Sequence, residues 1–403
     1  MKPHLLFLCH RIPFPPDKGD KIRAFHILKH LQKFFRIHLG CFYDDPADEV
    51  HIPSLRREVE SLNCLRIRQT FSKIKAVTRI RPGQALSVAY YQNNEMSEWV
   101  RTIARQNDIA QVFVFSSTMA PYAEFVTKVP KFLDMVDIDS EKFASYGKAS
   151  EFPFNVVWSR EARTLLKFER AMIGRFDRTI FASQAEKRRF DVLAPESIEN
   201  TDWVTNGVDI AYFSPELRFL SPFASRPAIV FTGAMDYRPN IEAVLWFSKQ
   251  VLPALARHKR NPVFYIVGSN PDPDVQKLSA HDNVVVTGKV PDIRPYLAHA
   301  SVSVAPLRIA RGIQNKVLEA MAMARPVIVS TEAFKSINAT PGHDLIVADD
   351  ADEMVRAVNE ILDLNHDHLG KNARRTICDR YDWATSLSRL DKILSLSCSA
   401  EVI

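Results

Sequence analysis

The sequence lacks the features on which disulfide-rich folds, zinc sites and membrane spans depend. Its cysteines are odd in number, widely spaced and without a C-x-x-C pair: Cys9, Cys41, Cys64, Cys378 and Cys398. This pattern indicates neither a disulfide framework nor a zinc site, and it suits a reducing compartment. No run approaches the ~18 apolar residues that a membrane span needs, and the first apolar run is too short for a signal peptide. We therefore expect a cytoplasmic protein, although one that can touch a membrane.

Length and charge set further bounds. At 403 residues the chain is longer than most single domains, and 46% hydrophobic residues are ample for two cores. The net charge of +6 suits anionic partners such as nucleotide diphosphates, acidic lipids or nucleic acid. Basic residues interleaved with aromatic ones, as a nucleic-acid interface needs, are missing, so we do not expect nucleic acid as a partner.

Glycine is also scarce, with 12 residues in 403, against an average usage of about 7%. Four of these glycines stand directly after predicted strands of the second half of the chain: Gly233, Gly268, Gly288 and Gly312. A glycine after a strand lets the backbone approach a ligand closely, and packing alone explains this placement less well. The pattern predicts a ligand-binding edge on a parallel sheet.

The stretch from Arg311 to Ser330 is the most informative. It reads as a loop, a helix over about 314–324 and a strand over 327–330, and a short buried strand at 301–306 precedes it. The loop should lie outside the carboxyl edge of a parallel sheet, where open α/β folds bind ligands. The helix start offers unpaired N–H groups to an anion.

The spacing on this helix brings three polar side chains together. Glu319 is four residues from Asn315 and three from Lys316, so all three share one face. A cation for phosphate and a carboxylate for sugar hydroxyls can therefore meet at one helix end. A glutamate on an amphipathic helix is by itself most often a solvated surface residue. The glycine, the lysine and the following strand favour a binding site.

These residues carry a resemblance to a known family. Glu319, followed by Ala320-Met321-Ala322 and Arg325-Pro326-Val327, resembles the nucleotide-sugar site of retaining GT-B glycosyltransferases of family 4. In that family a helix begins with a glutamate and carries a second one eight positions later. The first would fall at Arg311 here, while Asn315-Lys316 resembles a variation in which an N-K pair precedes V-L-E-A.

The resemblance implies roles for residues of the second half. Gly233 would lie near the diphosphate of the donor, with Arg238 just beyond it. The backbone of Val290 would hold the nucleobase, and Glu319 the ribose hydroxyls. Lys316, with backbone N–H groups and a helix dipole, would stabilise the departing diphosphate. The predicted donor-binding set is Gly233, Arg238, Gly268, Val290, Gly312, Asn315, Lys316 and Glu319, and the predicted catalytic set is Lys316, Glu319 and Asp137.

A second loop follows the predicted strand Leu5 to Cys9. The words HRIPFPPDKGDKIR combine three prolines with Gly19, and Asp20 reads as the cap of a helix over 22–31. They closely resemble a bacterial subgroup of sugar transferases associated with exosortase-type exopolysaccharide systems. The family's equivalent loop faces the reacting sugar and the acceptor, which implies such a place for Lys18, Gly19 and Asp20. The alternative is a turn whose charges are merely solvated.

Acidic residues end the predicted strand at 131–139. Asp134, Asp137 and Asp139 alternate with apolar residues, and we expect them to face one side. Such carboxylates can serve as a general base or hold a metal. The family often places a histidine or an acid here to bind sugar hydroxyls, so the resemblance favours hydroxyl recognition by Asp134 and Asp137. A metal site needs a clearer ligand set, and neither a metal nor another cofactor is expected.

Residues 54–82 mix apolar residues with eight arginines or lysines and only two glutamates. Such a basic amphipathic segment can lie on an anionic membrane at the inner face of the plasma membrane, where a lipid-linked acceptor would be found. An ordinary basic helix–strand–helix face is equally compatible with the pattern.

The resemblance covers nearly the whole chain and predicts an α/β protein of the GT-B fold, with two doubly wound Rossmann-like domains facing a central cleft. The turn at Asn206-Gly207 marks the hinge. Residues 1–207, joined by a crossing helix at 384–403, would form the acceptor side, and 208–383 the nucleotide-sugar domain.

The predicted function is sugar transfer, with retention, from a nucleotide-diphosphate sugar to a glycan or lipid-linked acceptor in exopolysaccharide synthesis. The alternatives are a nucleotide-sugar 2-epimerase, which needs acid–base side chains and no acceptor, and a non-catalytic binder of glycans or sugar nucleotides. The second alternative is suggested by Arg311 in place of the family's glutamate.

Overall fold

The chain folds into two compact units. A computed structural model describes residues 2–16, 19–67, 83–310, 312–364 and 367–396. The first unit contains Met1–Thr205 and Leu387–Ile403, and the second is the continuous segment Asn206–Ser386. Each unit is built on its own parallel sheet with its own hydrophobic core. The expected α/β class with two doubly wound sheets is confirmed.

The first sheet has seven strands in the order β3-β2-β1-β4-β5-β6-β7. All its strand pairs are parallel, and the inner strands are buried on both faces, which is why they read as continuous apolar runs such as LLFLC. The strands are β1 (His4–Cys9), β2 (Arg36–Tyr43), β3 (Ser61–Arg66), β4 (Ile109–Phe115), β5 (Lys131–Val136), β6 (Arg178–Phe181) and β7 (Thr201–Trp203).

Helices and short turns connect these strands. The helix α1 (Gly19–Leu31) begins earlier than the predicted start at residue 22. Asn93 and Ser183 cap α5 and α8 by accepting hydrogen bonds from backbone N–H groups of the first turn. The remaining helices of this unit are α2 (Ile52–Glu58), α4 (Leu86–Tyr90), α5 (Asn94–Gln106), α6 (Asp139–Ala149), α7 (Phe154–Ile173) and α8 (Gln184–Leu193).

Two sequence interpretations of the first unit need revision. The strand at 178–182 was expected to close the sheet, but β7 forms its edge beyond β6. The three-residue strand T-D-W carries too little apolar pattern to be recognised. Within residues 54–82, the described part is the end of α2 followed by β3, as in the ordinary helix–strand alternative. Residues 68–82 lie outside the described part of the chain.

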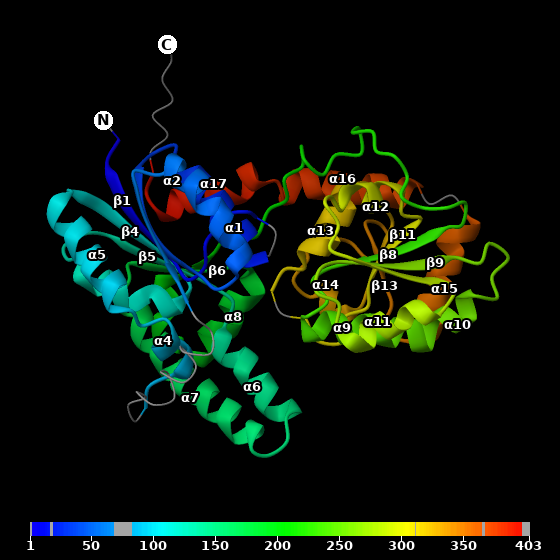
Figure 1. Ribbon diagram of the computed structural model, residues 1–403, viewed down its shortest axis with the longest axis horizontal. Coiled ribbons are helices and arrows are strands. Elements are labelled where there is room, and N and C mark those ends of the chain that lie inside the picture. The colour runs from blue at the N-terminus through cyan, green and yellow to red at the C-terminus, as the bar shows by residue number, and fades with distance from the viewer. Residues whose placement is uncertain (1, 17–18, 68–82, 311, 365–366, 397–403) are drawn as a thin grey trace, which may run out of the picture. The chain divides into compact units, whose positions relative to one another are not determined.

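The second sheet has the order β10-β9-β8-β11-β12-β13, again with parallel pairs. In Figure 1, α9, α10 and α11 lie along one side of this sheet, and α12 and α13 along the other. The strands are β8 (Ala228–Thr232), β9 (Val263–Val267), β10 (Val284–Gly288), β11 (Val302–Ala305), β12 (Val327–Val329) and β13 (Ile346–Val347).

The helices of the second unit follow from local signals. An Asp350–Glu353 capping box starts α15, and α13 ends where Ala324 takes a positive φ of 55° before Pro326. The last helix, α17 (Trp383–Ile393), begins in the second unit and ends in the first. The others are α9 (Arg238–Trp246), α10 (Leu252–Leu255), α11 (Pro273–Lys277), α12 (Arg294–His299), α13 (Asn315–Ala322), α14 (Thr331–Phe334), α15 (Ala351–Asp363) and α16 (Asp367–Arg380).

Candidate functional site

The strand order of the second sheet reverses between β8 and β11. Such a switch point opens a crevice at the carboxyl ends of the strands, and open α/β sheets bind ligands there. Gly233 directly follows β8, and the loop that contains Gly312 follows β11. Their φ angles of 153° and 61° lie in the region that favours glycine. Two of the predicted donor-binding glycines therefore flank the switch point.

Lys316, in the first turn of α13, lies beside the Gly233 loop. Its ammonium donates a hydrogen bond to Oδ1 of Asn240 at 2.6 Å and lies 4.9 Å from the ring centre of Phe231. A Cβ atom built on Gly233 would be 3.3 Å from Cε of Lys316. Burial lowers the pKa of Lys316 to about 8, against the opposing charge of Glu319. The lysine thus stays mainly cationic at neutral pH, at a place where backbone can approach a ligand.

Glu319 lies one turn further along α13. Burial raises the pKa of its carboxyl to about 7, although the charge of Lys316 works against this shift. Asn315 occupies the first position of the same helix, and its Oδ1 accepts a hydrogen bond from Asn206 at 3.3 Å. The structure therefore brings Lys316 and Glu319 together, as the spacing predicts. It ties Asn315 to the segment that opens the second unit.

Two predicted donor-side residues have structural partners. Arg238, at the start of α9, pairs along its own helix with Glu242 at 2.8 Å, and its side chain is 62% exposed. A Cβ atom at Gly268 would lie 1.7 Å from the carbonyl oxygen of Gly233. Packing therefore accounts for Gly268, contrary to the expectation that ligand approach explains it better. Val290 is half-buried and packs against the core of the unit beyond β10.

Sequence reasoning missed the partners of Lys316. Asn240 holds the lysine with Oδ1, and its Nδ2 donates to the carbonyl of Ala234 at 2.8 Å. One side chain thus links α13 to the Gly233 loop. The available signal was the position of Asn240 in the first turn of the helix that directly follows that glycine. The role of Phe231 could not be recognised, because a phenylalanine within a buried strand reads only as core.

The first sheet reverses its order between β1 and β4, and a charged group lies after β1. Asp20 accepts a hydrogen bond from Arg11 at 2.7 Å and pairs with Nε2 of His10 at 3.4 Å. Burial works to raise the pKa of Asp20, but the hydrogen bond from His10 and the charge of Arg11 lower it well below its usual range. His10 also stacks on Phe115, at the end of β4.

Asp20 was expected to cap α1. It lies instead inside the first turn, after Gly19, and is held by two side chains from the end of β1. The ion pairs require residues ten positions apart to meet across a loop, which helix periodicity cannot reveal. Lys18 and Arg311 lie outside the described residues.

The three aspartates after β5 do not face one side. Asp134 is fully buried, and its Oδ2 accepts a hydrogen bond from Nε of Arg23 at 2.9 Å. Arg23 is also fully buried and donates to the carbonyl of Val204 at 2.8 Å. Asp134 is therefore an interior ion-pair partner, and its expected role as a sugar ligand is wrong. The alternation fails because β5 is irregular at Val136, whose φ is 65°.

Asp137 lies beyond this irregularity. Its Oδ1 is buried and has no hydrogen-bond partner in the structure. Burial and the nearby carboxylates of Glu186 and Asp139 raise the pKa of Asp137 to about 7. Asp139 carries a raised pKa for the same main reason, burial, and the charges of Lys142 and His10 oppose the shift. Asp137 is thus a carboxyl with an unused oxygen at the carboxyl edge of the first sheet.

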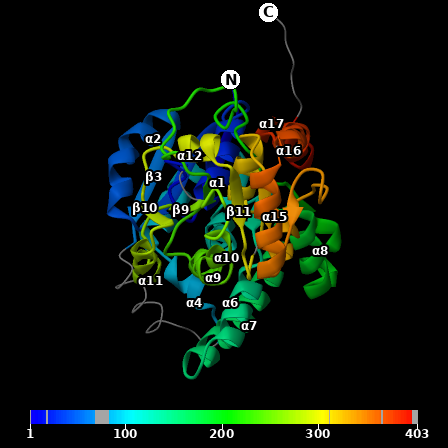
Figure 2. The same ribbon diagram turned by 90° about the vertical axis from the view of Figure 1, so that its right-hand side faces the viewer.

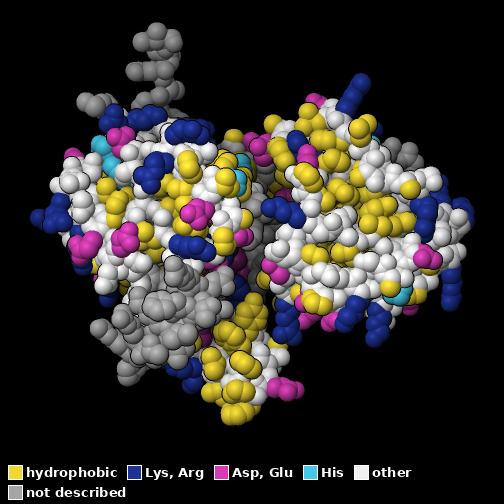
Figure 3. All heavy atoms as spheres, in the orientation of Figure 1, with side chains coloured by type: hydrophobic (Ala, Val, Ile, Leu, Met, Phe, Trp, Pro, Cys, Tyr) yellow, Lys and Arg dark blue, Asp and Glu magenta, His cyan; other side chains and the backbone are white. Residues whose placement is uncertain are grey.

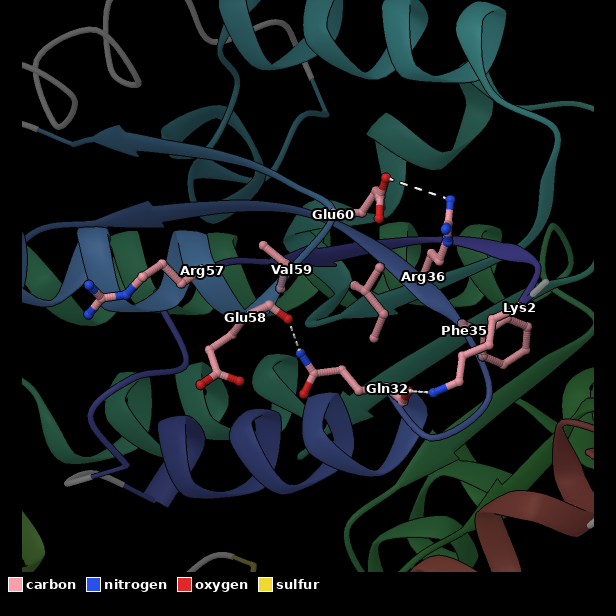
Figure 4. A pocket seen from close by; sticks show the side chains of 9 residues that line it. Lys2, Gln32, Phe35, Arg36, Arg57, Glu58, Val59 and Glu60 are labelled. Carbon is pink, nitrogen blue, oxygen red and sulfur yellow. Dashed lines mark hydrogen bonds and ion pairs between the residues drawn. The ribbon is translucent and has the colours of Figure 1, made fainter. Parts of the chain in front are cut away.

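A hollow of about 400 Å³ lies elsewhere on the first unit (Figure 4). It is lined by residues at the start of β2 and the end of α2, at the edge opposite to the carboxyl ends. Its charged groups satisfy one another, as in the Arg36–Glu60 ion pair and the bond from Lys2 to the carbonyl of Gln32. We assign it no part in the candidate site.

Two further observations concern the described residues alone. No group of three or more His, Cys, Asp or Glu side chains in this part of the chain is arranged to hold a metal ion. Over the same residues, no helix combines the length and the apolar character needed to cross a bilayer.

Comparison with solved structures establishes the fold. HepE from Anabaena, solved in complex with UDP and glucose, matches with a TM-score of 0.68 and 15% identity over 98% of this chain and 99% of that chain. Sucrose-phosphate synthase from Thermosynechococcus elongatus matches with a TM-score of 0.70 and 18% identity over 98% of both chains. TarM from S. aureus matches with a TM-score of 0.64 and 12% identity over 98% and 99%. The protein has the GT-B glycosyltransferase fold.

Sequence comparison adds a family. Residues 226–364 match the family described as glycosyl transferases group 1. The match contains β8, α13 and therefore the Gly233, Lys316 and Glu319 site. No curated protein matches the chain. The family match and the shared fold together support a glycosyltransferase that uses a nucleotide sugar.

Proposed function

We propose that this protein is a retaining glycosyltransferase of family 4, of the hexosyltransferase type. It would transfer a sugar from a nucleotide-diphosphate donor, bound by the second unit, to a glycan or lipid-linked acceptor on the first. The observation that carries the proposal is the group formed by Lys316, Asn240 and Gly233 at the switch point of the second sheet, with Glu319 one turn away. It falls within the region that matches glycosyl transferases group 1.

The donor site would act mainly through electrostatics. When the bond from the anomeric carbon to the diphosphate breaks, negative charge develops on the leaving phosphate. The Lys316 ammonium and the N–H groups at the start of α13 are placed to stabilise that charge. Asn240 holds the lysine in position before the ligand arrives. Glu319 would accept hydrogen bonds from the ribose hydroxyls.

The sugar is transferred to an acceptor hydroxyl, whose oxygen forms the new bond to the anomeric carbon on the same face. In the retaining mechanism that we propose, the leaving phosphate takes the proton of that hydroxyl. No step requires a protein nucleophile or a divalent metal. Activity should therefore persist in the presence of a chelator, and complete loss in EDTA with rescue by Mg²⁺ would contradict this point.

Asp137 is the favoured hydroxyl-binding residue on the first unit. Its buried, unpartnered Oδ1 can accept a hydrogen bond from a sugar, and it lies at the edge where ligands of such sheets bind. Lys18, Gly19 and Asp20 belong to the proposed acceptor side as well. The resemblance of this loop to exopolysaccharide-associated transferases supports an acceptor in cell-surface polysaccharide synthesis. We place the reaction in the cytoplasm, at the inner face of the plasma membrane.

Calorimetric titration with UDP-, GDP-, ADP- and CMP-sugars tests the donor site. We expect one nucleotide series to bind the wild type, and Lys316→Ala and Glu319→Ala to weaken that binding at least about tenfold, because each removes a charged or buried polar partner. Two exposed ion-pair residues of the same unit provide matched controls, Lys277→Ala and Glu332→Ala, which should bind as the wild type does. If no nucleotide binds the folded wild type, the proposed function fails.

A nucleotide-sugar 2-epimerase is the second candidate, because Asp137 and Glu319 both have a pKa of about 7, as acid–base chemistry needs. Incubation with the bound donor in the absence of an acceptor separates the two reactions. Epimerised nucleotide sugar would support the second candidate, and transfer that requires an acceptor would support the first. Donor binding with neither product would indicate a non-catalytic binder.

A further inference from the structure

The hairpin of α6 and α7 in the first unit ends in a cluster of exposed apolar side chains. Phe152 is 82% exposed, Phe154 61% and Val156 56%, and Val157 is 40% exposed. Figures 1 and 2 show the hairpin extending away from the first sheet, and Figure 3 shows hydrophobic side chains gathered over its end. We call these four residues the apolar tip. A soluble surface does not usually expose adjacent phenylalanines and valines, so this tip needs an explanation.

The two helices behind the tip are tightly joined. A Cβ atom at Gly147 would lie 2.7 Å from Oγ of Ser159, so only glycine permits this helix contact. Glu161 is buried on the other side of α7, where its carboxylate accepts hydrogen bonds from the backbone N–H groups of Leu86 and Ser87. The hairpin is thereby held to the first unit. The tip is a supported projection, and its apolar side chains could not be buried by a small rotation of α7.

Aromatic residues follow directly behind the tip. Trp158 stacks on Phe143 with ring centres 5.5 Å apart and meets the edge of Tyr146 at 6.2 Å. All three are half-buried between the helices. At a rise of about 1.5 Å per residue, Trp158 lies about 6 Å behind Phe154 along the helix axis. Tryptophan and tyrosine at such a distance behind an apolar end are typical of membrane–water interfaces.

Positive charge lies one step further back. Lys148, Arg160 and Arg163 flank the hairpin, while Glu151 is the one exposed acid among the described residues 148–163. The only other acid of that stretch is the buried Glu161. Arg160 and Arg163 are about 9 and 14 Å from Phe154 along α7. Interfacial helices bury their apolar residues about 5–10 Å deep, which would bring these arginines to the level of the lipid headgroups.

We propose that the apolar tip of the α6–α7 hairpin inserts into the interface of an anionic lipid bilayer. The order apolar, aromatic, cationic matches the layers of such an interface. A protein partner fits less well, because a specific interface buries about 800 Å² on each side and the tip is only the end of one hairpin. This inference rests on the membrane contact included in the proposed function, and it names the element that makes that contact.

Vesicle flotation of the full chain tests the inference. Vesicles of phosphatidylcholine with 30% phosphatidylglycerol should carry the wild type, and pure phosphatidylcholine should carry less, because the basic residues lose their anionic partners. Phe152→Ser/Phe154→Ser should reduce the partition coefficient on mixed vesicles at least about tenfold. Val192→Ser/Ile198→Ser, which changes exposed apolar residues of the same unit, is the matched control and should float as the wild type does.

A second pair of variants separates charge from apolar insertion. Lys148→Gln/Arg163→Gln should weaken binding to the mixed vesicles and leave binding to phosphatidylcholine unchanged. In Phe152→Trp, bromine-labelled acyl chains should quench a larger share of the fluorescence than in the wild type, since the new indole lies in the acyl region.

Three outcomes would overturn the inference. Equal flotation of the wild type and Phe152→Ser/Phe154→Ser would show that another part of the chain binds lipid, and the proposed membrane contact would survive. Flotation of neither protein would remove both. A dimer in sedimentation equilibrium that the same double substitution abolishes would instead assign the tip to a second copy of the chain. Nucleotide titration of each variant reports independently on folding and on the donor site.

Discussion

At the scale of single residues, the environment of Lys316 makes nucleotide binding sensitive to pH. Burial lowers its pKa to about 8, so the ammonium that would hold the diphosphate is lost as the pH rises through that value. If only the protonated form binds, the affinity should fall about tenfold between pH 7 and pH 9. Calorimetric titration of the nucleotide over this range measures the effect.

Lys316→Arg is the control for this prediction. The guanidinium stays protonated at pH 9, so the variant should bind with an affinity that hardly changes over the same range, even if that affinity is lower at pH 7. A wild-type affinity that is constant from pH 7 to pH 9 would show that the charge of Lys316 does not contribute to donor binding.

Asp134 and Arg238 belong to two ion pairs whose loss should have different effects on stability. Asp134 is fully buried against Arg23, so Asp134→Asn leaves a buried guanidinium without its counter-charge and should destabilise the protein by about 3–5 kcal/mol. Arg238→Ala removes an exposed pair with Glu242 and should cost less than about 1 kcal/mol. Urea denaturation of both variants tests the contrast, and equal costs would mean that Asp134 is not an interior ion-pair partner.

At the scale of elements, the loops after β8 and β9 depend on each other. Gly268→Ala would place a methyl group 1.7 Å from the carbonyl oxygen of Gly233, so one loop must move. We expect a loss of about 1–3 kcal/mol in stability and weaker nucleotide binding, because Lys316 lies against the same Gly233. Thermal denaturation and calorimetry measure the two effects.

Gly174→Ala provides the comparison for this element. Gly174 follows α7 with ordinary helical backbone angles, and a Cβ atom there meets nothing within 4 Å. The substitution should leave nucleotide binding unchanged and stabilise the protein by about 0.4–1 kcal/mol through the unfolded chain. If Gly268→Ala behaved in the same way, the close contact between the two loops would not restrict that position.

At the scale of the whole molecule, the fold could be predicted further than the site. Apolar runs and the residues that interrupt them fixed most strands of both sheets, because strands buried on both faces leave a clear pattern. The position of Lys316 next to Glu319 also followed from helical spacing. The role of Asn240, the Asp134–Arg23 pair and the His10–Arg11–Asp20 group did not follow, since each joins elements far apart or across a loop. Such contacts are set by tertiary packing, which periodicity does not encode.

The division of the chain into units has a consequence for its synthesis. The second unit is one continuous segment, while the first is completed by residues from Leu387 onward. In that last piece, Asp391 pairs with His30, and Arg389 pairs with Asp202 and lies over the ring of Trp203. A ribosome makes these residues last. The nucleotide-binding half can therefore finish folding first, and the half that begins the chain waits for the end of translation to close its final contacts.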